Sequence, residues 1–392
     1  MRRQNLALVL GTVAGGGPLS RADVADRTGL TRAAVGNLVG QLREAGLINE
    51  LGPAASGRVG RPGSSVALAD RGPAGLGLEI GVEHLGACVV DLSGTVRTWI
   101  QVEADNRGRP PAEALAELGA VADAAYRHAE AQGLRPAGTV VAIPGLIGDA
   151  PGTVLHAPNL GWHSVPVARD LRPVLPVPLR DAPVEIDNEA NLGALAELWH
   201  GASAADFVHV SAEAGIGAAL VIGGRLHRGA AGFAGELGHV PVHPDGPACT
   251  CGAHGCLEQY AGQAAVLRAA GLAEAPGDHI GLLAQRALDG DAPVHEALDR
   301  AGRALGTALS GTVNLIDPAA VVLGGAYAEL GPWLLPGLRA ELAARVTVRP
   351  WAPEALLVSE LGRRGPLLGA ATATVRRIIE DPAAHLKLLS EV

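Results

Sequence analysis

Lysine is nearly absent from this chain of 392 residues: Lys387 is the only one, and arginine supplies the remaining basic charge. Long hydrophobic runs are missing as well, because charged residues, glycine or proline interrupt every apolar segment, which excludes an ordinary transmembrane helix. The basic, apolar start superficially resembles a secretion signal, but the apolar residues between Leu6 and Val13 recur at the spacing of one helix face. We therefore expect a cytoplasmic protein with no membrane partner.

Cysteine is also scarce, with four residues, and three of them fall within eight positions of the chain. These three are Cys249, Cys251 and Cys256. Two cysteines two residues apart do not readily form a strain-free disulfide, whereas three thiolates can take three corners of a tetrahedron around Zn²⁺. His239 is the best candidate for the fourth corner, and His243 and His254 are nearer competitors. The alternative is a set of buried free cysteines, which would have to cluster by accident.

Charge is divided unevenly along the chain. Residues 1–75 contain nine arginines against five acidic residues, whereas the remainder contains 22 basic against 35 acidic residues. A basic head on an acidic body predicts a polyanionic partner for the head alone. With 48% hydrophobic and 18% charged residues, the chain can form two or three globular domains, and no short repeat or low-complexity tract interrupts it.

The head contains the pattern of a helix-turn-helix. Ser20 and Asp23 form a capping box that begins one short helix, and Gly29 can adopt the left-handed conformation that ends it. Thr31 then caps a second helix, whose apolar stripe occupies residues 35–42 and whose other face carries small and hydrogen-bonding residues. This face is typical of a recognition helix for the DNA major groove, and a plain helical hairpin is the alternative. The expected DNA contacts are Arg21, Thr31, Arg32, Asn37 and Gln41.

A wing is expected after the second helix. Residues 47–51 and 64–68 have the composition of two strands. The Gly/Pro-rich segment between them holds Arg58 and Arg61, which could reach phosphates or a minor groove. A solvated linker loop is the competing interpretation.

The remainder is predicted to be an α/β body. Residues 71–75, rich in glycine and proline, would link it to a winged helix-turn-helix domain of residues 1–70. Three consecutive strands followed by alternating helix and strand are expected within residues 76–190. A second such unit is expected within residues 191–364. Two lobes of this kind would enclose a cleft.

The glycine-rich segment that holds the cysteines resembles the signature of the ROK family, which contains bacterial sugar kinases and sugar-responsive repressors. The resemblance is carried by E-x-G-H at residues 236–239 and C-x-C-G-x-x-G-C-x-E at 249–258. It implies that His239 and the three cysteines hold one structural zinc per chain, in a loop of residues 239–256. It also implies a two-lobed, ribonuclease-H-like and actin-like ATPase fold, preceded by the winged domain that the family's regulators carry. A C-terminal helix at 365–392 would complete the first lobe.

A sugar site in the cleft is a further implication of the resemblance. Sugar hydroxyls both donate and accept hydrogen bonds, so several carboxylate and amide side chains must converge with an imidazole. Each of these side chains alone is more often a helix cap or a surface group. The expected sugar contacts are Asn159, Asn188, Glu189, Glu236, His239 and Glu258.

The nucleotide side departs from the family's kinases. Where they carry D-x-G-G-T, this chain has E-I-G-V-E at residues 79–83, and where they carry G-T-G-I-G, it has E-A-G-I-G at 213–217. Glu189 occupies the position of the kinases' catalytic Asp in N-D-A-N. We therefore expect no catalytic residue and no enzyme. The alternatives are an ATP-dependent hexose or amino-sugar kinase with an added DNA-binding head, and a sensor that has lost its ligand and binds a protein partner.

The predicted function is that of a sugar-responsive transcriptional regulator, in the first place a repressor of carbohydrate uptake or catabolism genes. Its partners would be duplex operator DNA and a monosaccharide or sugar-phosphate effector. A homodimer or homotetramer is expected as well, because paired recognition helices bind half-sites about one helical turn apart.

Overall fold

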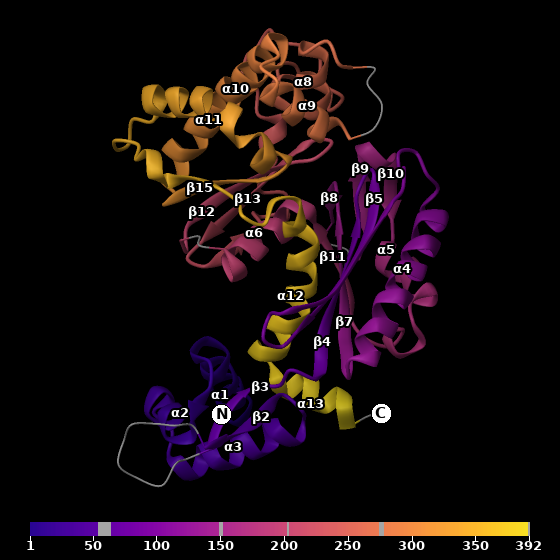
Figure 1. Cartoon of the computed structure of the whole chain (residues 1–392), viewed down its shortest axis with the longest axis vertical. Coiled ribbons are helices and arrows are strands. Elements are labelled where there is room, and N and C mark those ends of the chain that lie inside the picture. The colour runs from indigo at the N-terminus through magenta and orange to yellow at the C-terminus, as the bar shows by residue number, and fades with distance from the viewer. Residues whose placement is uncertain (54–63, 149–151, 202–203, 274–277, 391–392) are drawn as a thin grey trace.

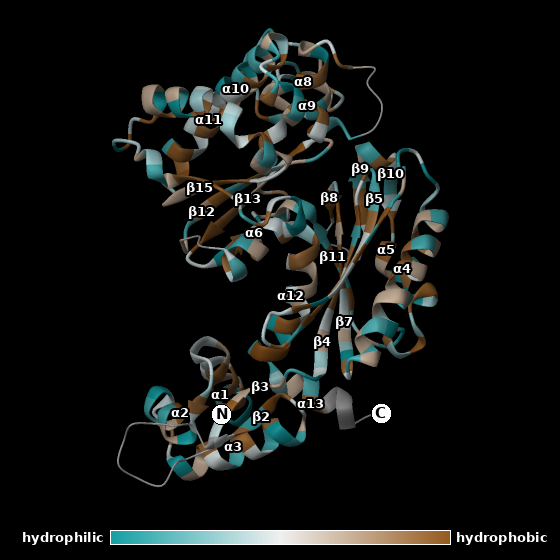
Figure 2. Cartoon of the chain, in the orientation of Figure 1, coloured by the Kyte–Doolittle hydropathy of each residue, from teal (hydrophilic) through white to brown (hydrophobic). Residues whose placement is uncertain are grey.

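A computed structural model describes residues 1–53, 64–148, 152–201, 204–273 and 278–390, with the backbone alone at 53, 64 and 387–390 (Figure 1). A small head lies at one end of the molecule, and two α/β lobes follow it. Hydrophobic residues concentrate in the central strands and in α12 between the lobes (Figure 2). This architecture matches the predicted fold class.

The head is a helical domain with a small antiparallel sheet. Its described elements are α1 (Arg2–Gly16), β1 (Leu19–Ser20), α2 (Arg21–Thr28), α3 (Arg32–Glu44), β2 (Ile48–Pro53) and β3 (Ser64–Leu68), with sheet order β1-β3-β2. The apolar face of α1 is buried, from Leu6 to Val13, so the N-terminal segment is a core helix. The two strands expected around the wing are present, and β1 joins them as a third.

The predicted caps of the helix-turn-helix are confirmed. Ser20 and Asp23 bond reciprocally, and Gly29 ends α2 in the left-handed region with φ 69°. The Thr31 hydroxyl accepts a hydrogen bond from the Ala34 amide at 3.2 Å and begins α3. The wing residues Arg58 and Arg61 lie outside the described residues, so their role stays a prediction.

The first lobe is a five-stranded sheet of order β11-β7-β4-β5-β6. Its strands are β4 (Gly72–Ile80), β5 (His84–Asp91), β6 (Val96–Glu103), β7 (Leu134–Ile143) and β11 (Val184–Asn188). Helix α4 (Pro111–Ala131) covers one face, and α12 (Gly365–Glu380) packs on the other. A smaller sheet of β8 (Leu146–Ile147), β9 (Val154–Ala157) and β10 (Trp162–Val165), which the sequence did not predict, is inserted between β7 and β11.

The linker expected at residues 71–75 is instead the beginning of β4. Gly72 pairs with Leu134 of β7, and Ala74 pairs with Asp91 of β5. Sheet hydrogen bonds on both sides therefore order a segment whose glycine and proline content suggested a flexible connection. The strand begins only two residues after the head ends at residue 70.

The second lobe is a five-stranded sheet of order β14-β13-β12-β15-β16. Its strands are β12 (Phe207–Ala212), β13 (Ile216–Ile222), β14 (Arg225–His227), β15 (Ala320–Gly325) and β16 (Leu356–Val358). One face packs on α7 (Glu258–Ala261), α8 (Gln263–Ala269), α9 (His279–Leu288), α10 (Ala292–Ile316) and α11 (Ala326–Arg345). The other face packs on α6 (Glu189–His200).

Helix α12 is the element that the three parts share. It contacts β4, β5 and β7 of the first lobe, α6 beneath the second, and α1 of the head. The single helix expected at 365–392 is divided, because Pro382 cannot continue α12 and begins α13 (Pro382–Ser390). Helix α13 contacts α1 as well, and Arg3 of α1 forms an ion pair with Asp381 between the two C-terminal helices.

The described helices include none that combines the length and apolar character of a membrane span.

Replacing Gly77 with alanine tests the close approach of β4 and α12. A Cβ at this position would lie 2.4 Å from the Ala371 nitrogen and 2.6 Å from the Leu367 carbonyl oxygen, so a backbone would have to move. We expect Gly77→Ala to lower the free energy of unfolding by about 1–3 kcal/mol in urea denaturation. Gly311→Ala in α10 is the control, because its Cβ would meet nothing within 4 Å. Equal stability of the two variants would contradict the close contact.

Candidate functional site

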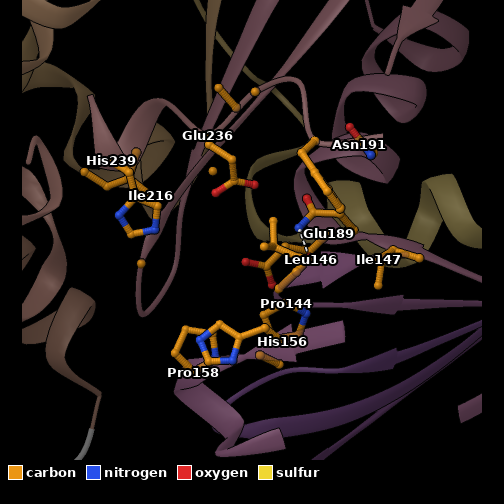
Figure 3. A pocket seen from close by; sticks show the side chains of 18 of the residues that line it. Pro144, Leu146, Ile147, His156, Pro158, Glu189, Asn191, Ile216, Glu236 and His239 are labelled. Atoms are coloured by element: carbon orange, nitrogen blue, oxygen red, sulfur yellow. Dashed lines mark hydrogen bonds between the residues drawn. The ribbon is translucent and has the colours of Figure 1, made fainter. Parts of the chain in front are cut away.

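A cavity of about 540 Å³ opens between the two lobes (Figure 3). The end of β7, the β9 hairpin, the start of α6, β13 and the segment of residues 232–258 all contribute to its wall. Each of the six residues expected to bind sugar lines it: Asn159, Asn188, Glu189, Glu236, His239 and Glu258. In Figure 3, Glu189, Glu236 and His239 surround the same space from different elements. The structure thus brings together residues that are 99 positions apart in sequence.

Asn188 is fixed by bonds to the backbone. Its side-chain oxygen caps α6 by accepting a hydrogen bond from the Ala190 amide at 2.8 Å, and its amide group donates to the Gly145 carbonyl at 2.9 Å. Gly145 itself has φ 113°, and a Cβ there would lie 2.4 Å from the His156 carbonyl oxygen. Asn188 therefore ties the β7 turn to the start of α6, and one N–H and one lone pair of its amide remain for a ligand.

Asp187 is a lining residue that the sequence analysis missed. Both of its carboxylate oxygens accept hydrogen bonds from the Arg228 guanidinium, at 3.0 and 2.5 Å, and one also accepts from the Asn191 amide group at 2.9 Å. The hydrogen bond and charge of Asp187 raise the pKa of Arg228. The signal was present, since Asp187 directly precedes Asn188 in the I-D-N-E-A-N segment.

Glu236 and Glu258 reach the cavity from the segment that holds the cysteines. The Ile216 amide donates a hydrogen bond to the Glu258 carboxylate at 3.2 Å, across a gap that Gly215 keeps open. Burial raises the pKa of Glu236, which His239 opposes and Glu258 reinforces. These two carboxylates can accept hydrogen bonds from ligand hydroxyls.

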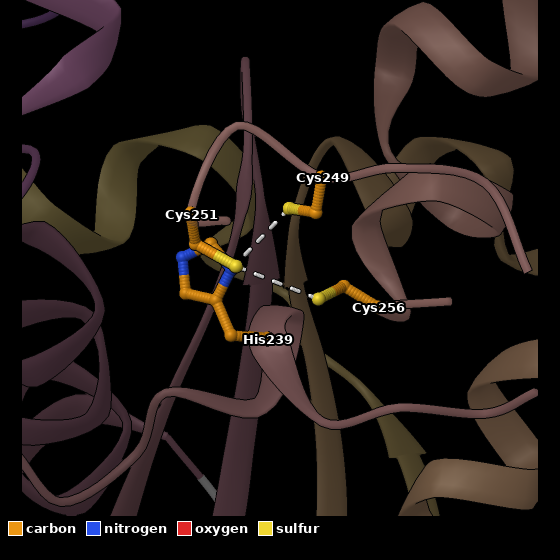
Figure 4. Close-up of side chains that lie close together, drawn as sticks. All are labelled: His239, Cys249, Cys251 and Cys256. Atoms are coloured by element: carbon orange, nitrogen blue, oxygen red, sulfur yellow. Dashed lines mark hydrogen bonds between the residues drawn. The ribbon is translucent and has the colours of Figure 1, made fainter. Parts of the chain in front are cut away.

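A cluster of metal-ligand side chains lies beside the cavity (Figure 4). The ligand atoms of His239, Cys249, Cys251 and Cys256 all lie within 4.8 Å of one another. The Cys249 sulfur is 3.8 Å from the His239 Nδ1, and the Cys251 sulfur is 3.7 Å from the Cys256 sulfur. Zinc–sulfur bonds of about 2.3 Å in a tetrahedron place two sulfurs about 3.8 Å apart, so the donor set fits a zinc ion. His239, and neither His243 nor His254, belongs to the cluster of described residues.

The predicted DNA contacts divide into two groups in the structure. Thr31, the N-cap of α3, and Arg32 and Asn37 on α3 are exposed, although the Thr31 hydroxyl and the Asn37 side-chain oxygen each accept one hydrogen bond within the head. Gln41 accepts hydrogen bonds from Arg2 and donates one to Asn37 at 3.1 Å, while Arg21 forms an ion pair with Glu50 of β2. Arg21 and Gln41 are therefore engaged within the head.

Comparison with known proteins identifies the family. The ROK family profile matches residues 75–377 of the chain. The chain belongs to the ROK family. The MarR family profile matches residues 7–58 of this ROK protein, which include the helix-turn-helix. The predicted family is thereby confirmed.

Both regulators and kinases are among the relatives. The xylose repressor of Bacillus spizizenii is 29% identical over 97% of each chain. A crystal structure of a ROK family transcriptional regulator, homologous to the E. coli MLC protein, gives a TM-score of 0.80 over 99% of each chain at 24% identity. A ROK family glucokinase from Streptomyces griseus, in complex with glucose and AMPPNP, gives a TM-score of 0.64 at 28% identity, covering 76% of this chain and 98% of its own.

The side of the cleft away from the cysteines holds a group of ionisable side chains, among them Glu79 and Glu213 from the two segments that were expected to depart from the kinase pattern. Arg363 forms an ion pair with Glu213 at 3.0 Å, and His84 lies 3.5 Å from Glu79. The remaining space among these residues and Glu189 is only about 20 Å³. Burial and the carboxylates of Glu213 and Glu79 raise the pKa of Glu189 to about 8.

Glu83, which the sequence analysis expected to repel phosphate, has a partner of its own. It forms an ion pair with Arg107, which reduces its repulsive charge. Burial raises the pKa of Glu213 to about 7, and the ion pair with Arg363 opposes this rise. The Glu213–Arg363 pair therefore occupies this side of the cleft, while Arg107 offsets the charge of Glu83.

Replacing Glu189 with glutamine should stabilise the protein most at alkaline pH. The folded protein holds the Glu189 proton up to a pKa of about 8, against 4.5 as the reference value. Stability therefore falls as pH rises from about 4.5 to 8, since the unfolded chain releases this proton earlier. We expect the gain in unfolding free energy of Glu189→Gln to be larger at pH 8 than at pH 5, by on the order of 1 kcal/mol. Glu130→Gln, on the exposed face of α4, is the control. A gain independent of pH would contradict a buried, protonated Glu189.

Proposed function

We propose that this ROK protein is a sugar-responsive transcriptional regulator, in the first place a repressor of genes for carbohydrate uptake or catabolism. Residues 1–70 would bind duplex operator DNA, and the cavity between the lobes would bind a monosaccharide or sugar phosphate. The observation that carries the proposal is the combination in one chain of a winged helix-turn-helix head with a polar cavity lined by four carboxylates. The relatives support this proposal. The similarity to a xylose repressor extends over 97% of both chains, whereas the similarity to a glucokinase extends over only 76% of this chain.

The proposed mechanism is linkage between the two sites. A sugar that binds one placement of the lobes more tightly than another shifts the population toward it. Operator affinity then falls by no more than the ratio of the sugar's affinities for the two placements. We propose that the regulator works as a homodimer or homotetramer, because two recognition helices must meet two half-sites.

Binding to operator DNA should depend on Arg32. Its exposed position at the start of α3 suits a base edge in the major groove, and Arg32→Ala should then cost about 1–3 kcal/mol of binding free energy. Affinity should also fall as salt rises, because bound arginines release counterions from the phosphates. Gel-shift titration with the DNA upstream of the protein's own gene measures both effects. Arg127→Ala, an exposed arginine on α4, is the control, and an equal response of the two variants would place Arg32 away from the DNA.

Zinc should bind at one ion per chain. His239, Cys249, Cys251 and Cys256 would hold it, and the ion would order the loop that presents Glu236 and Glu258 to the cavity. Elemental analysis of protein purified without added metal should give about one zinc per chain, and Cys251→Ser should lose zinc and weaken sugar binding. Cys88→Ala changes a buried cysteine outside the cluster and should keep the zinc. Full zinc content in Cys251→Ser would assign the ligand elsewhere.

A sugar kinase is the second candidate function, since Glu189 is an acid at the kinase base position and the cavity adjoins it. We expect no useful turnover. The extra methylene of Glu189 moves the carboxylate by on the order of 1 Å, which can cost about a hundredfold in rate, and the Glu213–Arg363 pair narrows the nucleotide side. A coupled ADP-release assay with the tightest-binding sugar measures this. Turnover above about 1 s⁻¹ would overturn the assignment as a sensor without catalysis.

A further inference from the structure

Acidic side chains outnumber basic ones in the lining of the sugar cavity. Its carboxylates are Asp187, Glu189, Glu236 and Glu258, and the cationic or titratable side chains lining it are Arg228, His156 and His239. Arg228 is bound through two nitrogens to Asp187, at 3.0 and 2.5 Å. The Nδ1 atom of His156 lies 3.2 Å from that of His163, and His239 belongs to the metal-ligand cluster. Arg228 is therefore committed to Asp187, and each of the two histidines has one ring nitrogen engaged.

The end of α6 that lines the cavity is capped by its own chain. Helix α6 begins at Glu189, and an unoccupied helix N-terminus attracts phosphate through its free amides and its dipole. Here the Asn188 side chain accepts the hydrogen bond of the Ala190 amide at 2.8 Å. The Glu189 side chain lies at the same end of the helix and lines the cavity.

The space next to the sugar cavity, beside Glu213 and Arg363, is too small to admit a charged group from a ligand. About 20 Å³ remains among Glu189, Glu213 and Arg363, against about 540 Å³ in the sugar cavity. Arg363 and His84 are the basic side chains that line that space. The Arg363 guanidinium is held by Glu213 at 3.0 to 3.3 Å, and His84 lies 3.5 Å from Glu79. A phosphate group extending from a sugar would have to displace the Glu213–Arg363 ion pair.

We propose that the cavity accepts a monosaccharide that carries no phosphate and rejects its phosphorylated form. Hydroxyl groups can donate to Glu236 and Glu258, whereas a phosphate dianion would be desolvated beside acidic side chains while Arg228 is already paired with Asp187. The Asp187–Arg228 pair determines this selectivity, because it neutralises the arginine on the wall. The inference rests on the proposed sugar-binding function of the same cavity.

Calorimetry with matched pairs of ligands tests the proposal on the full-length, metal-containing protein. The pairs are xylose and xylose 5-phosphate, glucose and glucose 6-phosphate, and N-acetylglucosamine and its 6-phosphate. For at least one pair we expect the free sugar to bind and its phosphate to bind at least about 100-fold more weakly. Equal or tighter binding of any phosphate would overturn the proposal. Binding of neither member of any pair would overturn the sugar-binding function itself, while operator binding by the head would stand.

Asp187→Asn gives a second, independent measurement. The substitution removes the carboxylate and leaves Arg228 on the cavity wall without its ionic partner. We expect the preference for the free sugar over its phosphate to fall by about tenfold or more, the change that a charge-assisted interaction of about 1.4 kcal/mol produces. Asp181→Asn, an exposed aspartate remote from the cavity lining, is the control. An unchanged preference in Asp187→Asn, with the free sugar still bound, would show that this ion pair does not set the selectivity.

Discussion

The close contact between α12 and its neighbours is the constraint on which the other parts of this ROK protein depend. Alanine at Gly75 or Gly77 of β4 would place a Cβ within 2.4 Å of the Ala371 backbone. Gly369 of α12 makes an equally close approach to the Leu192 carbonyl of α6, where a Cβ would lie at 2.0 Å. Helix α12 is thereby held between the sheet of the first lobe and the helix that begins at the cavity between the lobes. The cavity wall can keep its shape because these backbones are packed without intervening side chains.

The chemistry of the cleft follows from how its charges are paired. Two arginines that could have attracted anions, Arg228 and Arg363, are each bound to a carboxylate of the chain. In the described part of the chain Glu189 has no such ionic partner, and burial together with the carboxylates of Glu213 and Glu79 raises its pKa to about 8. A carboxyl group with a pKa near neutral pH is partly ionised there and can take up a proton.

Much of this could be predicted from the sequence because the decisive signals are local. The capping box at Ser20, the left-handed Gly29 and the cap at Thr31 each depend on a few neighbouring residues, and all are present in the structure. The spacing of the cysteines predicted their cluster in the same way.

Three of the errors share a cause, which is pairing between distant segments. Residues 71–75 have the composition of a linker, but from Gly72 onward they pair with β7 and β5 as part of a strand. The sequence analysis treated Glu83 as an unpaired charge, whereas in the fold it forms an ion pair with Arg107. The bond between Asp187 and Arg228 joins residues 41 positions apart, and no local pattern reports it.

The shared core of the head and the body has a consequence for how this protein can be dissected. Apolar residues of α1 and α3 belong to one continuous cluster with Val90 of β5 and with Leu368 and Ile379 of α12. A cut at residue 75 would expose this surface on both fragments, so the DNA-binding part cannot be treated as an exchangeable module. Grafting it onto another body, or expressing it alone, would require either the C-terminal helices or redesigned polar residues in their place.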